Sequence, residues 1–300
     1  MILLIQANRK KAGIIIILAA VLLLLSSDFF ATTAICDACF ARTIWDAVPA
    51  DCTALCFPDG EATLQGYLFR PAGQSAALVV LAPGLGSCIE AYLGCVRFLT
   101  QNGYTVFYFD PTGSGKSGGN SALGYGQIVQ DLQYTLCFVR EQAYFDNDRM
   151  LLLGHSRGGF AVCCAANEPD VSGVVAVGAH NSCMDAILAA STQHVGVFAY
   201  CNYPMLWLVQ AMRTGVSSVR LRADRVLAQS NTPTLIFQGR CDRAAPPDAY
   251  SVYAYRDNSF PASVQFFLYD AADSSHSAML QEDAPALQQI LSFLNTVLGQ

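Results

Sequence analysis

A serine between glycines places the strongest constraint on how this chain can fold. The stretch Gly154-His155-Ser156-Arg157-Gly158 follows an apolar run, Met150 to Leu153, which is typical of a strand buried on both faces. Small and apolar residues that favour a helix come directly after it. A strand, a sharp turn and a helix in this order form the context of a nucleophile elbow. Ser156 is therefore the candidate nucleophile, and the alternative is a structural turn serine.

Apolar strands and amphipathic helices alternate along the chain from about residue 53 to the C-terminus. The predicted strands cover residues 53–57, 64–69, 77–82, 104–109, 151–153, 171–177, 234–237 and 264–269. Alternation of this kind predicts an α/β fold with a mostly parallel sheet and helices on both of its faces. Ligands of such sheets bind beyond the carboxyl ends of the strands. Residues 181–232 interrupt the alternation and are rich in aromatic residues and methionine.

The first 35 residues differ in character from the rest of the chain. Arg9-Lys10-Lys11 precedes a run without polar side chains, residues 12–25. This pattern predicts a signal peptide cleaved near Ala34, or an uncleaved signal anchor across about residues 12–30. In both cases the basic cluster stays inside, and the rest of the chain is exported, either secreted or anchored to the membrane.

We divide the chain into a leader, residues 1–35, a cysteine-rich extension, residues 36–60, and one domain, residues 61–300. The extension contains four of the twelve cysteines: Cys36, Cys39, Cys52 and Cys56. In an exported chain they predict one or two disulfides that clamp the extension to the domain. A zinc site of four thiolates is the alternative.

Charge and motif content exclude several classes of partner. The net charge is −6 and only 13% of the residues are charged, which argues against nucleic acid and against an anionic membrane surface. The segment Gly113-Ser114-Gly115-Lys116-Ser117 resembles the end of a phosphate-binding loop, but Asp110 stands where that motif requires its first glycine. We predict no cofactor and no metal.

A serine nucleophile needs a base and an acid that orients the base. Of the four histidines, His276 follows the last strand in a polar loop, and we predict it as the base, with His180 as the second candidate. Asp242 follows the preceding strand and is the predicted acid, with Asp185 as the alternative. The order Ser156, then Asp242, then His276 is the order that accompanies a nucleophile elbow of this kind.

The oxyanion of the reaction needs two fixed backbone donors. We expect one to be the N–H of Arg157, directly after the nucleophile, and the other to be the N–H of Leu85, after the strand at 77–82. The aromatic residues of the 181–232 segment suggest an apolar pocket that includes His180, Tyr203 and Trp207. The alternative is that they only pack this segment on the sheet.

These segments together resemble the α/β-hydrolase superfamily over roughly residues 50–300. Asp110 to Ser117 looks like the family's D-x-R-G-x-G-x-S segment with Thr112 in place of arginine, and Gly154 to Gly159 looks like its G-H-S-x-G-G elbow. Pro83-Gly84 stands where many members have His-Gly. The resemblance implies an eight-stranded sheet, a small helical cap formed by residues 181–232, and hydrolysis of esters or related acyl bonds.

We therefore expect an exported serine hydrolase that cleaves small-molecule carboxylic esters, with an apolar acyl or aryl group, through an acyl-enzyme on Ser156. The same triad would serve a peptidase or amidase similar to the S33 group, or an acyltransferase. Two other classes are a non-catalytic binding protein with this fold and a redox or metal protein that uses the N-terminal cysteines. No oligomeric state is predicted.

Overall fold

The computed structural model describes residues 2–45, 48–60, 62–142, 145, 149–282 and 284–300. These residues form one sheet with the spatial order β1-β2-β4-β3-β5-β6-β7-β8. Its strands are β1 (Thr53–Pro58), β2 (Thr63–Phe69), β3 (Leu78–Ala82), β4 (Thr105–Asp110), β5 (Met150–His155), β6 (Val171–Val177), β7 (Thr234–Gly239) and β8 (Val264–Tyr269). Strand β2 runs antiparallel to both of its neighbours, and the other pairs are parallel. The predicted α/β fold with a mostly parallel, eight-stranded sheet is confirmed.

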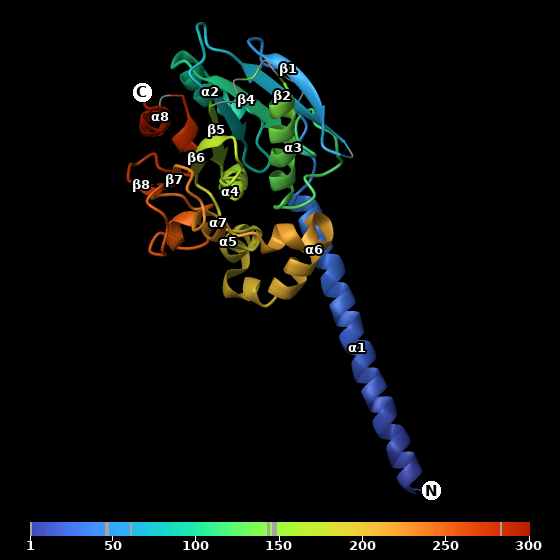
Figure 1. Cartoon of the computed structure of the whole chain (residues 1–300). Coiled ribbons are helices and arrows are strands. Elements are labelled where there is room, and N and C mark those ends of the chain that lie inside the picture. Colours follow the sequence, from blue (N-terminus) through green and yellow to red (C-terminus); the bar gives the residue numbers. More distant parts are fainter. Residues whose placement is uncertain (1, 46–47, 61, 143–144, 146–148, 283) are drawn as a thin grey trace.

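Helices connect the strands and cover both faces of the sheet (Figure 1). The α-helices are α1 (Ile2–Cys39), α2 (Leu93–Gln101), α3 (Gln127–Glu141), α4 (Arg157–Cys164), α5 (Cys183–Val195), α6 (Tyr203–Arg220), α7 (Ala223–Leu227) and α8 (Pro285–Leu298). Short 3-10 helices are η1 (Ile89–Tyr92), η3 (Gly196–Tyr200), η4 (Val252–Tyr255) and η5 (Ala278–Leu280).

Two apolar cores lie on the two faces of the sheet because side chains alternate along each strand. In β3, Leu78 and Val80 belong to the core that includes side chains of α3 and α4. Val79 and Leu81 belong to the opposite core, with side chains of α2 and α8. Both faces of β3 are buried, which explains why this strand is an unbroken apolar run in the sequence.

The segment between β6 and β7 forms the helices α5, η3, α6 and α7 in place of a single crossover helix. We call α5, η3 and α6 the cap. Figure 1 shows them grouped at one end of the molecule, below the sheet, with the C-terminal part of α1 beside α6. Helix α1 itself projects away from the domain over most of its length.

The structure does not support the predicted disulfides, since all twelve cysteines are free. The four cysteines of the extension lie apart in different surroundings. Cys36 and Cys39 belong to α1, and Cys36 Sγ lies 3.6 Å from the Gln210 amide of α6. Cys56 lies in β1, where its thiol contacts the Gln65 side chain, and Cys52 precedes that strand. Residues 36–39 of the predicted extension thus continue the long helix α1, and residues 53–58 of it form β1.

Candidate active site

Ser156 lies at a sharp turn between β5 and α4. Its backbone has φ 56° and ψ −115°, a strained conformation for a residue with a side chain. The turn requires its two flanking glycines. A Cβ on Gly154 would lie 2.3 Å from the carbonyl oxygen of Gly158, and a Cβ on Gly158 would lie 2.0 Å from that of Ala82. The strand-turn-helix context predicted from the sequence is therefore the one that the structure has at Ser156.

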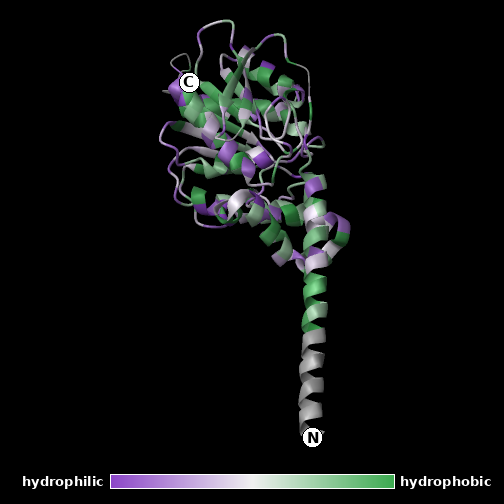
Figure 2. Cartoon of the chain, turned by 90° about the vertical axis from the view of Figure 1, so that its right-hand side faces the viewer, coloured by the Kyte–Doolittle hydropathy of each residue, from purple (hydrophilic) through white to green (hydrophobic). Residues whose placement is uncertain are grey.

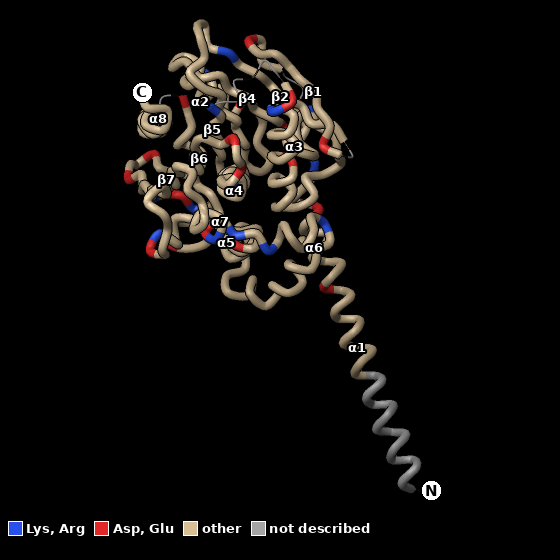
Figure 3. The backbone as a smooth tube through the Cα atoms, in the orientation of Figure 1, with Lys and Arg blue, Asp and Glu red and all other residues tan. Residues whose placement is uncertain are grey.

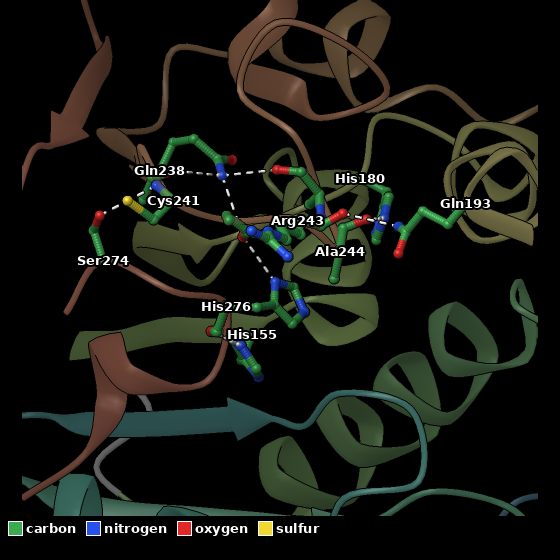
Figure 4. Close-up of polar contacts among 12 residues, drawn as sticks. His155, His180, Gln193, Gln238, Cys241, Arg243, Ala244, Ser274 and His276 are labelled. Carbon is green, nitrogen blue, oxygen red and sulfur yellow. Dashed lines mark hydrogen bonds and ion pairs between the residues drawn. The ribbon is translucent and has the colours of Figure 1, made fainter. Parts of the chain in front are cut away.

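The loops after β7 and β8 bring Asp242 and His276 together. His276 Nδ1 lies 2.7 Å from Asp242 Oδ2, and the carboxylate is fully buried. The Asp242 carboxylate also accepts hydrogen bonds from Ala245 N (2.8 Å) and from the Gln238 amide (3.2 Å), as Figure 4 shows in part. These bonds fix the carboxylate so that it can hold the imidazole in one orientation and one tautomer.

Ser156 and His276 line the same cavity, whose volume is about 670 Å³. This volume lies within the range of small-molecule sites. Leu85 and His180 also line it, and the remaining walls are mostly apolar side chains of the cap and of α1. The structure thus brings the predicted nucleophile, base and acid to one edge of the sheet, with Asp242 directly behind His276.

The two expected oxyanion donors lie beside Ser156. Arg157 is the first residue of α4, where backbone N–H groups have no partner within the helix. Leu85 lines the cavity, and the preceding residue, Gly84, approaches Ser156 so closely that a Cβ there would lie 3.4 Å from Ser156 Cβ. The N–H groups of Leu85 and Arg157 therefore remain the candidate donors of the oxyanion hole.

His155 packs behind the site. Its Nε2 lies 2.8 Å from the backbone carbonyl of His276, which can only accept, so Nε2 carries the proton. Its Nδ1 then accepts from the Tyr92 hydroxyl (3.0 Å), whose oxygen accepts from Gly84 N (2.7 Å). Burial, and then the neighbouring His276, lower the pKa of His155 to about 3. The imidazole is neutral and joins the loop of Leu85 to that of His276.

His180, the second candidate for the base, has partners at both ring nitrogens. Its Nε2 donates to the Ala244 carbonyl (2.9 Å), and its Nδ1 accepts from the Tyr125 hydroxyl (2.8 Å). Burial lowers the pKa of His180 to about 4. An imidazole held in this way forms part of the cavity wall and is not available to take a proton from Ser156.

Other residues that the sequence singled out lie away from the chemistry. Asp185, the alternative acid, accepts from the Ser182 hydroxyl (2.6 Å) at the start of α5. Tyr203 and Trp207 are not among the described residues that line the cavity, where α6 contributes Leu206. Trp207 packs instead against the small apolar cluster between α5 and α6. Packing of the cap is thus the better interpretation of Trp207, whereas Tyr203 is exposed.

Two residues that support the site were missed in the sequence. A Cβ on Gly178 would lie 2.9 Å from Asp242 Oδ2 and 3.1 Å from His276 Nδ1, so only glycine leaves room for this pair. Gln238 lies at the end of β7 with its amide on the Asp242 carboxylate. Gly178 could have been noticed in the sequence because it comes directly after the predicted strand at 171–177. Nothing in the sequence marks Gln238, four residues before Asp242, as a hydrogen-bond partner of the acid.

The positions of these groups on the sheet match those of one large superfamily. The serine follows β5, the carboxylate follows β7 and the imidazole follows β8. A family model described as serine aminopeptidase, S33, matches residues 73–195, which include Ser156. The fold and the matched segment are similar to those of the α/β-hydrolase superfamily. The resemblance predicted from the sequence is therefore confirmed, and it supports a hydrolase.

Solved structures of hydrolytic enzymes overlay on most of this chain. An esterase of Pyrococcus furiosus has a TM-score of 0.66 at 17% identity, over 86% of this chain and 98% of the esterase. Est1E of Butyrivibrio proteoclasticus, solved with ferulic acid bound, has a TM-score of 0.60 at 17% identity, over 82% and 99%. An acylaminoacyl peptidase of Pyrococcus horikoshii has a TM-score of 0.58 at 15% identity, over 81% of this chain and 41% of that chain. At these identities the likeness concerns the fold.

Relatives in sequence are more limited in extent. The uncharacterized protein YfhR of Escherichia coli (strain K12) is 28% identical over 145 residues, which is 47% of this chain and 49% of the relative. The chain thus matches about half the length of that relative. YfhR of Salmonella typhimurium is 25% identical over 225 residues, 70% of this chain and 72% of the relative.

Proposed function

We propose that this protein is an exported serine hydrolase that cleaves carboxylic esters with an apolar acyl or aryl group. The observation that supports it most directly is the 2.7 Å contact of His276 Nδ1 with the buried Asp242 carboxylate, in a cavity that His276 shares with Ser156. These are the nucleophile, base and orienting acid that acyl transfer needs.

In the proposed reaction, the free nitrogen of His276 takes the Ser156 proton while Oγ attacks the ester carbonyl. The carbonyl becomes a tetrahedral oxyanion, which accepts hydrogen bonds from the N–H groups of Leu85 and Arg157. His276 then gives the proton to the leaving alkoxide, which departs as the alcohol and leaves an acyl-Ser156. A water molecule, deprotonated by the same imidazole, attacks the acyl group. The bond from the acyl carbon to Ser156 Oγ then breaks, Oγ takes the proton back from His276, and the carboxylic acid is released.

An ester is favoured over an aminopeptidase substrate by the charge of the cavity. An aminopeptidase has to hold the protonated α-amino group of its substrate, and a buried cation requires an opposite charge. The described residues that line the cavity include no Asp or Glu. The walls are instead largely apolar, which suits an acyl or aryl group.

A panel of substrates tests this proposal. We expect turnover of p-nitrophenyl esters of increasing acyl length, and much slower turnover of aminoacyl anilides. An acyl adduct on Ser156, detected by mass spectrometry after rapid quenching, would identify the covalent step. If Ser156→Ala hydrolysed the esters as fast as the parent protein does, the proposal would be wrong. Faster turnover of the anilides would instead favour the peptidase.

A further inference from the structure

The C-terminal end of α1 is part of the folded domain, although the sequence allowed this segment to be a cleaved leader. The helix runs without a break through Ala34, the predicted cleavage site. Thr32 and Cys36 are buried, and Arg213 of α6 holds this end of the helix through the Thr33 carbonyl (3.1 Å) and the Asp37 carboxylate (2.6 Å). Cleavage after Ala34 would remove part of this docking surface.

The same end of α1 forms one wall of the cavity that holds Ser156. Ile35, Cys36 and Cys39 line it, as does Phe40 directly after the helix, and α5 contributes residues that include Ile187 and His194. The substrate cavity therefore lies between the apolar N-terminal helix and the cap.

On the side of α1, the cavity wall continues into a surface that suits a lipid bilayer. Residues Ile17–Cys39 form a helical segment long and apolar enough to cross a membrane. Ile35 is 59% exposed and borders the cavity, and Leu22, Leu23 and Leu24 below it are each more than 60% exposed. Figure 2 shows this apolar helix extending from the domain into open space.

On the side of the cap, the cavity wall also continues into an apolar surface. The chain contains no Asp, Glu, Lys or Arg from residue 186 to residue 212, and Figure 3 shows the outer edge of the cap without charged residues. Val197 and Phe198 of η3 follow the cavity residue His194 and are 75% and 74% exposed. The Asn202 amide, just after η3, lies 3.0 Å from Thr32 Oγ1, so this edge lies beside the apolar segment of α1.

We propose that α1 is retained as a membrane anchor and that the cavity opens against the bilayer, so that the substrate is a lipid ester held in the membrane. Its acyl chain would enter between α1 and α5, while Val197 and Phe198 rest in the acyl region of the bilayer. The contact is apolar, which agrees with a chain that has few basic residues. The choice of substrate rests on the proposed function, whereas the membrane contact does not.

Tryptophan quenching tests the membrane contact without any need for activity. The full-length chain carrying Phe198→Trp is reconstituted in phosphatidylcholine vesicles, with or without brominated acyl chains. Phe267→Trp on the edge strand β8, where Phe267 is 37% exposed, is the matched control, since both variants retain the two native tryptophans. We expect bromolipid to quench Phe198→Trp more than Phe267→Trp. Equal quenching of the two variants would overturn the membrane contact. The same result is expected if a second copy of the chain, rather than the bilayer, covers this edge.

Hydrolysis then tests the route of the substrate. The double variant Val197→Ser, Phe198→Ser should hydrolyse p-nitrophenyl palmitate in vesicles about tenfold more slowly, because two apolar side chains no longer hold the cavity against the bilayer. Its hydrolysis of water-soluble p-nitrophenyl acetate should be unchanged. Equal rates of the parent and the double variant on both esters would overturn the route, and so would a mature chain whose mass shows that it begins near residue 35. A parent protein that hydrolyses neither ester while Phe198→Trp is quenched would refute the proposed function alone.

Discussion

The Nε2 of His155, next to Ser156 in the chain, lies 2.8 Å from the backbone carbonyl of His276. The residue beside the proposed nucleophile therefore positions the loop of the proposed base. Through Tyr92 it also contacts Gly84, next to a proposed oxyanion donor. One neutral imidazole thus connects three parts of the site that lie far apart in the sequence.

Loss of the Tyr92 hydroxyl should disturb this connection. Tyr92→Phe leaves Gly84 N–H and His155 Nδ1 without their partner inside the protein, which should lower the free energy of unfolding by about 1–3 kcal/mol. We also expect kcat for an ester to fall, on the order of tenfold, because the oxyanion loop is less well fixed. Tyr104→Phe is the matched control, since its hydroxyl bonds to Asn295, far from the site. If both variants lost stability and neither lost kcat, His155 would have a structural role only.

Gly178 should tolerate no side chain. The methyl group of Gly178→Ala would lie within about 3 Å of both Asp242 and His276, so we expect the pair to separate and kcat to fall by a factor on the order of 10² or more. Gly196→Ala is the control, because Gly196 has the same φ of +56° with no atom near the added methyl. Equal effects of the two changes on kcat would show that backbone strain, rather than contact with the pair, is responsible.

Acid should destabilise the fold through two buried histidines. The pKa values of His155 and His180 are lowered to about 3 and about 4. Because the unfolded chain takes up these protons near pH 6.5, stability is lost as pH falls below that value, by about 2 kcal/mol for each histidine at pH 5. Asp110, whose pKa burial raises to about 6, acts in the opposite direction and offsets about 1 kcal/mol. Burial also raises the pKa values of Asp131 and Asp185, which act in the same direction as Asp110.

Urea unfolding at pH 7.5 and pH 5 measures this difference. His180→Gln should lose less stability than the parent protein between the two pH values. An unfolding free energy that rises on acidification would contradict this account of the two buried imidazoles.

The side chain of Arg157 should matter for stability more than for turnover. It is buried and its guanidinium donates to the carbonyls of Ala122, Gly124 and Tyr125. Arg157→Met should lower the free energy of unfolding by about 2–4 kcal/mol, since it removes the buried hydrogen bonds that the guanidinium donates to these carbonyls. The backbone N–H stays, so kcat should change far less than for Ser156→Ala. Arg97→Met, at an exposed ion pair with Glu282, should change stability little.

The sequence predicted the sheet and the three groups at its edge because each follows an apolar strand, and strand ends of a parallel sheet meet at one side. The supporting contacts were not predictable in the same way. The positions of Gln238 and Tyr92 depend on how loops far apart in the chain fold against each other. The docking of α1 was missed for another reason, since an apolar leader has the same composition whether it is cleaved, spans a membrane or lines a cavity.

Labelling with a fluorophosphonate, followed by mass spectrometry of the modified peptide, tests the central claim most directly. We predict one adduct, on Ser156, that is absent in Ser156→Ala and forms far more slowly in His276→Ala, with turnover of an ester reduced by a factor on the order of 10⁶ in both variants. Asp242→Asn should lower turnover by a factor on the order of 10⁴. An adduct on another residue, or labelling of Ser156 at the parent rate when His276 is replaced, would contradict the account.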